Sequence, residues 1–96
     1  MRQVARIDKN QPAIVQALRG MGAEVLHTHT LGKGAPDIIV GHHGVNYLFE
    51  IKDPAQPKSK RHLTDDEQEF HARWRGTVYV IESFEDAQKI LEAGSE

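Results

Sequence analysis

Two short runs of strand-forming residues, separated by a His-His-Gly segment, constrain the fold of this chain most strongly. The first run, residues 37–41, is rich in β-branched side chains, and the second, residues 45–52, alternates apolar and polar side chains. Both patterns are typical of β-strands. The segment His42-His43-Gly44 between them predicts a tight turn. The two runs are therefore expected to pair as a β-hairpin.

The alternation in the second strand separates its side chains onto two faces of the sheet. If the turn consists of His42 and His43, Asp37 falls opposite Leu48 and lies diagonally next to Glu50, at about 7 Å. A turn with an odd number of residues would send Asp37 to the other face. The predicted core face is formed by Val45, Tyr47, Phe49 and Ile51, and the other face by Asn46, Leu48, Glu50 and Lys52.

A hairpin of even parity brings two carboxylates together with an amine beside them. Such a pair suits Mg²⁺, which one or two carboxylates hold while water and phosphate complete its shell. The backbone carbonyl of Ile51 is a candidate further ligand, and Lys52 could position a metal-bound water or stabilise a phosphoryl transition state. An alternative interpretation is structural: Glu50 and Lys52 would form an exposed ion pair of little energetic weight, and Asp37 would be a turn residue after Pro36.

The remaining patterns predict a helix that begins after Asn10 and ends at Gly20 or Gly22, a second helix at about 65–75, strands at 24–28 and 77–82, and a last helix after Ser83. Asn10 is a candidate N-cap, Thr64 with Glu67 forms a capping box, and Asp86 follows Ser83 at capping distance. The order is α-β-β-β-α-β-α. A strand-helix-strand crossover late in the chain implies a parallel strand pair. We therefore expect an α/β fold with a mixed central sheet flanked by helices, and a flexible arm or edge element at residues 1–9.

Composition sets the class of protein. Ninety-six residues suffice for one domain, expected to span residues 1–96. No cysteine is present, no apolar run is long enough to span a bilayer, and no secretory signal is visible, which favours a cytoplasmic protein without a membrane partner. The net charge of −2 argues weakly against nucleic acid, but residues 52–62 carry a local net charge of +3.

Here the chain resembles a known family. Pro36-Asp37 and Glu50-Ile51-Lys52 are similar to the PD-(D/E)XK nuclease signature. Together with the segment 34–41, Leu63-Thr64 and Gln68, they resemble the virus-type replication-repair nuclease (VRR-NUC) domain over about residues 10–87, in the stand-alone form found in bacteriophages.

The resemblance implies a restriction-endonuclease-like core and Mg²⁺- or Mn²⁺-dependent hydrolysis of phosphodiester bonds in DNA, in the cytoplasm of a bacterial host. It implies that Asp37 and Glu50 bind metal, that Lys52 is catalytic, and that Gln68 belongs to the active site. It also suggests structure-selective cutting of branched DNA such as four-way (Holliday) junctions. Cutting a symmetric junction favours a homodimer, for which apolar helix residues left over on so small a domain are a candidate interface.

The chain departs from the family in its first helix, which lacks the usual metal-binding glutamate. Gln11 is a candidate replacement through its carbonyl oxygen, or the position is vacant, which puts two-metal chemistry in question. The candidate DNA-contacting residues flank the active-site strands: Lys33, Lys58, Lys60, Arg61 and His62.

Other interpretations remain open from the sequence. The histidines have no clear third ligand for zinc, and Gly32-Lys33-Gly34 lacks the P-loop pattern. Phe70 and Trp74 are expected in the core or in a dimer surface. A catalytically impaired nucleic-acid-binding module and a structural subunit of a larger complex are the alternatives to an enzyme.

Overall fold

The computed structural model describes residues 8–94, and the predicted arm therefore lies largely outside the described residues. The described part is an α/β fold in the predicted order α-β-β-β-α-β-α, with two short 3₁₀ turns, η1 and η2, that the sequence did not predict. The elements are α1 (Gln11–Gly20), β1 (Glu24–His27), η1 (His29–Leu31), β2 (Ile38–His42), β3 (Val45–Ile51), η2 (Lys58–Lys60), α2 (Asp65–Arg73), β4 (Val78–Ile81) and α3 (Phe84–Gly94).

The four strands form one mixed sheet in the order β1-β2-β3-β4. The first three strands are antiparallel neighbours, whereas β3 and β4 run parallel. The parallel pair confirms the crossover predicted from the sequence, and α2 lies within that crossover. The sheet thus places the end of β3 next to the end of β4, with Ile51 paired to Ile81.

The hairpin turn lies one residue later than predicted. His42 pairs with Val45, so the two turn residues are His43 and Gly44. Both have positive φ angles, 49° and 79°, as a type I′ turn requires. Ile38 consequently pairs with Phe49, and Asp37, one step earlier, falls opposite Glu50 and not Leu48. The shift of two positions preserves the parity, so Asp37 and Glu50 still share a face.

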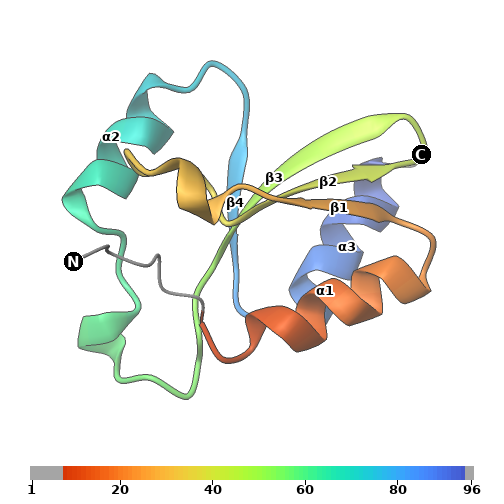
Figure 1. Ribbon diagram of the computed structural model, residues 1–96, viewed down its shortest axis with the longest axis horizontal. Coiled ribbons are helices and arrows are strands. Elements are labelled where there is room, and N and C mark those ends of the chain that lie inside the picture. The colour runs from red at the N-terminus through yellow and green to blue at the C-terminus, as the bar shows by residue number, and fades with distance from the viewer. Residues whose placement is uncertain (1–7, 95–96) are drawn as a thin grey trace.

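The core lies between the sheet and two of the helices. In Figure 1, α1 and α3 lie side by side against the same face of the sheet. From β3, Tyr47, Phe49 and Ile51 point into this core as predicted, whereas Val45, at the start of the strand, is 36% exposed. The helices contribute Ile14, Val15, Leu18, Ala87 and Leu91. Burial of these side chains provides the main driving force for folding.

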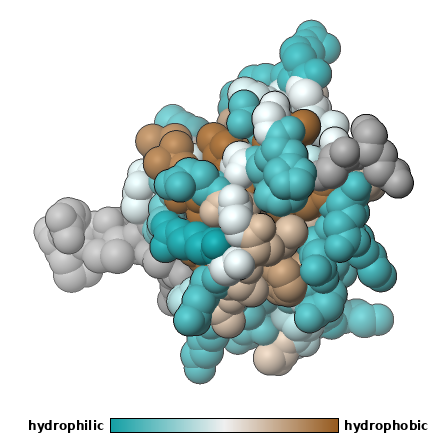
Figure 2. All heavy atoms as spheres, turned by 90° about the vertical axis from the view of Figure 1, so that its right-hand side faces the viewer, coloured by the Kyte–Doolittle hydropathy of each residue, from teal (hydrophilic) through white to brown (hydrophobic). Residues whose placement is uncertain are grey.

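The opposite face of the sheet also carries apolar side chains, but within residues 8–94 no pair of helices packs on them as α1 and α3 pack on the core face. The strand registers align Leu26, Ile39, Leu48 and Val78 in one row across all four strands. Leu26 is 62% exposed, and Val80, on the same face, is 48% exposed. On the side of the molecule that lies at the right of Figure 1, apolar residues are visible between hydrophilic ones (Figure 2).

Helix α2 is held by local contacts at its first turn and not by a core of its own. It buries no residue and stands apart from α1 and α3 (Figure 1). The predicted capping box is confirmed, since Thr64 Oγ1 accepts from Glu67 N at 3.2 Å and Glu67 Oε1 accepts from Thr64 N at 2.9 Å. Gly34 fits against this turn: a Cβ there would collide with the Asp66 carbonyl.

The prediction that Asn10 caps α1 through its side chain was wrong. Asn10 precedes α1 but makes no side-chain cap hydrogen bond. Its Nδ2 donates instead to the carbonyl oxygens of Lys52 and Glu82, both at 3.1 Å. Ser83 does cap α3, because its Oγ accepts from Asp86 N at 3.1 Å. Asn10 therefore ties the start of α1 to the ends of β3 and β4.

No helix in residues 8–94 is long and apolar enough to cross a membrane.

Candidate active site

Asp37 is fixed by three hydrogen bonds at the junction of three strands. Its backbone N donates to the Phe49 carbonyl at 3.0 Å, and its carbonyl accepts from Thr28 N at 2.9 Å. Its carboxylate oxygen Oδ2 accepts from Ile51 N at 2.7 Å. Burial raises the pKa of Asp37, while the hydrogen bond from Ile51 opposes this increase. A hydrogen bond with the Glu50 side chain also opposes the increase.

Glu50 is the most perturbed acid of the site. Its side chain is only 3% exposed, and Oε1 has no hydrogen-bond partner among the described residues. Burial first, and then the negative charges of Asp37 and Glu67, raise the pKa of Glu50 to about 10. Without a bound metal ion, Glu50 therefore holds a proton at neutral pH and can share it with the neighbouring carboxylates.

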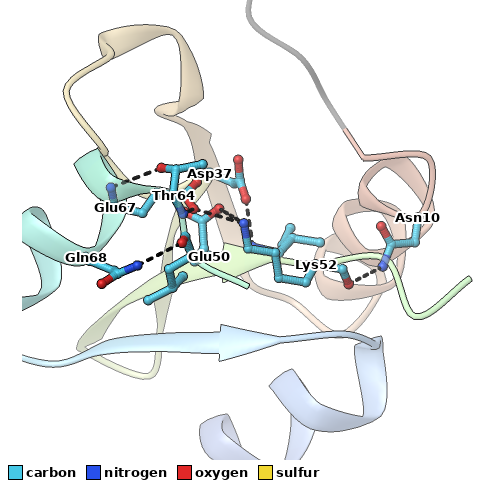
Figure 3. A network of polar contacts seen from close by, with 9 residues as sticks. Asn10, Asp37, Glu50, Lys52, Thr64, Glu67 and Gln68 are labelled. Carbon is cyan, nitrogen blue, oxygen red and sulfur yellow. Dashed lines mark hydrogen bonds and ion pairs between the residues drawn. The ribbon is translucent and has the colours of Figure 1, made fainter. Parts of the chain in front are cut away.

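Lys52 follows β3 and directs its amine at these acids (Figure 3). Its Nζ lies 2.9 Å from Glu67 Oε1 and 3.6 Å from Glu50 Oε2. Its backbone is held by Ile81, whose carbonyl accepts from Lys52 N at 2.9 Å. Burial lowers the pKa of Lys52, but the hydrogen bond and charge of Glu67 and the charge of Glu50 together raise it above its ordinary value.

Glu67 is a site residue that the sequence interpretation missed. The pattern Thr64-x-x-Glu67 had assigned it to helix capping, which is correct but incomplete. The same oxygen, Oε1, accepts from Thr64 N and from Lys52 Nζ, each at 2.9 Å. Although burial raises the pKa of Glu67, hydrogen bonds with Glu50, Thr64 and Lys52 lower it overall.

These side chains line a cleft of about 560 Å³. Its walls come from β3, from the loop after it, from the first turn of α2 and from the segment before α1. Carboxylates outnumber amines in the lining, which comprises Asp8, Lys9, Asp37, Glu50, Lys52, Asp53, Gln56, Lys60, Thr64 and Glu67. The cleft is therefore acidic although a basic loop borders it, and a bound cation would relieve the repulsion between its acids.

Asp8 is a second residue that the sequence interpretation missed. It precedes α1, lines the cleft, and has its pKa raised by burial. Gln11, the candidate for the absent helix glutamate, lies elsewhere. It is buried, lines a separate cavity with His27, and places Nε2 3.4 Å from His27 Nδ1, while its Oε1 has no partner in the described part of the chain. The cleft lining thus includes a carboxylate from the segment just before α1 and not Gln11.

Gln68 lies beside the cluster but turns away from the lysine. Its exposed side chain donates from Nε2 to the Leu63 carbonyl at 3.1 Å (Figure 3). The helix residue that contacts Lys52 is its neighbour Glu67. Ile51, whose carbonyl was a candidate ligand, is held against Asp37 through its own N–H.

Of the five candidate DNA-contacting residues, the cleft lining includes Lys60 alone. Lys60 lines the cleft, whereas Arg61 is drawn into an ion pair with Glu82, Nη1 to Oε2 at 3.3 Å. The other three, Lys33, Lys58 and His62, are exposed outside the cleft lining.

Within residues 8–94, no three His, Cys, Asp or Glu side chains are arranged to hold a metal ion together. The rings of His27 and His29 contact edge to face, and those of His42 and His43 stack. Any metal at the candidate site would therefore rest on two carboxylates, supplemented by backbone oxygen and water.

Comparison of the chain with protein-family models, with curated proteins and with solved structures finds no match.

Proposed function

We propose that the chain is a Mg²⁺- or Mn²⁺-dependent DNA endonuclease that resembles the VRR-NUC branch of the PD-(D/E)XK nucleases. The observation that carries the proposal is the convergence of Asp37, Glu50 and Lys52 in one acidic cleft. The hairpin places Asp37 opposite Glu50, thirteen positions away in the sequence, whereas Lys52 follows Glu50 by two residues on the same strand face.

The donor set fits a hard divalent cation. Two carboxylates are enough for Mg²⁺ when water and substrate phosphate complete the shell. The buried Oε1 of Glu50 lacks a partner, and the cleft carries an excess of acids. Asp37, Glu50 and the backbone carbonyl of Ile51 would hold the ion, with Asp8 as a nearby additional acid. A bound ion would acidify a coordinated water and neutralise charge on the phosphate.

The residues of the chain then have separate tasks. Lys52 donates hydrogen bonds to the attacking water or to a phosphate oxygen, where negative charge develops in the transition state. Glu67 holds the Lys52 amine at the edge of the cleft. Lys60, in the cleft wall, and Lys33, Lys58 and His62 outside it supply positive charge to the phosphodiester backbone, which positions DNA without reading its sequence.

Contacts of this kind favour recognition of DNA shape. The family resemblance separately supports branched DNA, such as four-way junctions, as the substrate. It also supports a homodimer as the working form and the cytoplasm of a bacterial host as the location. A dimer interface was predicted from apolar helix residues that the core leaves over. Helices α1 and α3 do not supply such residues, because their large apolar side chains face the core. The row Leu26–Ile39–Leu48–Val78 on the other face of the sheet, in which Leu26 is exposed and the other three side chains are half-buried, is the better candidate interface.

The proposal is tested by incubating the protein with linear, flap and four-way-junction DNA in Mg²⁺, Mn²⁺ or EDTA. We expect cutting in either metal and none in EDTA, with branched DNA preferred. Binding of junction DNA without cutting in any metal would instead support the alternative, a catalytically impaired binding module. Sedimentation of the protein alone separates a dimer from a monomer.

A further inference from the structure

The second half of α2 and its C-cap carry a stacked aromatic pair outside the hydrophobic core. The rings of Phe70 and Trp74 are 5.3 Å apart and inclined by 14°, and the Arg73 guanidinium lies 5.6 Å from the Phe70 ring centre. Trp74 is 45% exposed. Of the two expectations for this pair, the core is wrong, because α2 buries no residue, whereas the dimer surface stays a prediction.

The aromatic pair lies on the same side of α2 as the active-site glutamate. Phe70 and Trp74 follow Glu67 by three and seven residues, and these spacings repeat on one helix face. At 1.5 Å per residue, Trp74 lies about 10 Å along the helix axis from Glu67. This corresponds to about three base steps of a stacked strand, at 3.4 Å each.

The chemistry of this surface suits a nucleobase. Exposed aromatic rings stack on bases of any sequence, and arginine adds attraction for the π-face and for phosphate. Arg73 lies over the Phe70 ring, and Arg75, which follows Trp74 in the sequence, is exposed. A second protein surface would be expected to cover an apolar side chain, whereas here one ring of the pair already lies under the Arg73 guanidinium, and a positive charge beside aromatic rings suits a strand of bases and phosphates.

We propose that Trp74, supported by Phe70 and Arg73, is a stacking site for an unpaired nucleobase about three nucleotides from the phosphate bound in the cleft. This inference rests on the proposed function, because it assumes that DNA occupies the cleft. It gives a physical reason for structure selectivity: only DNA with an unpaired strand near the cleavage point, such as a flap or an opened junction, can engage both the cleft and the indole.

The single tryptophan of the chain makes this site directly observable. With Ca²⁺ as a non-catalytic cation, the protein is titrated with oligothymidine and with a closed duplex that has no free ends, while indole fluorescence is recorded. We expect the single strand to quench the fluorescence and the closed duplex to leave it nearly unchanged. The absence of quenching at saturating oligothymidine, shown by anisotropy of labelled DNA, would overturn the stacking site, as would the absence of binding.

Variants separate stacking from a structural role. Anisotropy should show that Trp74→Ala loses about tenfold or more in affinity for oligothymidine, whereas Trp74→Phe keeps most of it. Leu31→Ala, which shortens an apolar side chain that is 71% exposed elsewhere, is the control and should bind as wild type. If Trp74→Phe binds as poorly as Trp74→Ala, or if both bind as wild type, the inference is wrong.

Two further results keep this inference distinct from the proposed function. Quenching in wild type together with loss of affinity in Trp74→Ala, in a protein that cuts no DNA, would retain the stacking site and reject the nuclease. Normal cutting of flap DNA by Trp74→Ala would retain the nuclease and reject the stacking site. A dimer that Trp74→Ala dissociates in sedimentation would assign the surface to a second copy of the chain and overturn the proposal.

Discussion

Lys52 and Glu67 form an ion pair of 2.9 Å that joins the end of β3 to the first turn of α2. Because Glu67 Oε1 also accepts from Thr64 N, one oxygen both caps the helix and holds the proposed catalytic amine. The site and the position of α2 are therefore structurally linked. Lys52 is only 8% exposed, so this pair is shielded from solvent more than an ordinary surface pair.

Glu67→Gln should separate the two roles of Glu67. A glutamine can still accept from Thr64 N, so α2 should remain capped, but the charge opposite Lys52 is lost. We expect a decrease in the free energy of unfolding of about 1–3 kcal/mol, as for a hydrogen bond to a charged group, and slower cleavage. Urea denaturation of the single variants and of Lys52→Met/Glu67→Gln measures the coupling between the two side chains.

Thr64→Ala is the matched control for this variant. It removes the hydroxyl cap, at a cost of about 1 kcal/mol, but leaves the Glu67 carboxylate opposite Lys52. The account expects Thr64→Ala to lose stability with little coupling to Lys52→Met. Equal coupling for both variants would show that Glu67 acts on Lys52 only by holding the helix together.

The stability of the metal-free protein should fall as pH rises through neutrality. The pKa of Glu50 is about 10 in the folded chain and 4.5 in the unfolded chain, so between these values the folded state holds a proton that the unfolded state has released. Raising the pH then favours unfolding, by up to about 1.4 kcal/mol per pH unit from this group. Urea denaturation in EDTA at pH 6 and pH 8 measures the change.

Glu50→Gln removes this titration while keeping the shape of the side chain. Its stability should change less between pH 6 and pH 8 than that of wild type, and the variant should be the more stable protein at pH 8. Glu24→Gln, an exposed substitution on β1, should follow wild type. Parallel pH profiles for wild type and Glu50→Gln would contradict the assignment of a retained proton to Glu50.

Gly34→Ala should detach α2 from the loop that precedes Asp37. The added Cβ would collide with the Asp66 backbone carbonyl, and the φ of +78° is strained for alanine. We expect a loss of several kcal/mol in stability or faster hydrogen exchange confined to α2, together with loss of cleavage. Gly32→Ala has a similar φ of +73° but open space around its Cβ, and it should show only the backbone strain of about 1–2 kcal/mol. Similar effects in both variants would argue against the docking contact.

The part of the site that was predictable from sequence depends on strand periodicity. Asp37 and Glu50 were placed on one face although the turn was assigned one residue too early, because a shift of two positions in register restores the same face. The turn was mistaken because His43 adopts a positive φ, which is unusual for a residue other than glycine and leaves no clear signal in the sequence.

The missed residues depend on tertiary contacts. Thr64-x-x-Glu67 is a complete local signal for a capping box, so nothing in the pattern indicates that Glu67 also reaches Lys52. That contact depends on the path of the loop over residues 53–63, which periodicity does not specify. Asp8 was missed for a similar reason, since it lies in a segment without strand or helix periodicity. Asn10 shows the reverse: a typical capping residue was used for two tertiary hydrogen bonds instead.

The most direct test of the central claim is the rate at which wild type and Lys52→Met cut four-way-junction DNA in Mg²⁺, with Lys58→Met as a control for loss of an exposed positive charge. Methionine is unbranched and apolar and can fill the space of the lysine stem, so the fold should survive, as circular dichroism would verify. We predict cutting by wild type, a decrease of about a hundredfold or more in Lys52→Met, as for loss of a group that stabilises transition-state charge, and a small decrease in Lys58→Met. Equal rates for wild type and Lys52→Met, or no metal-dependent cutting by wild type, would contradict the account.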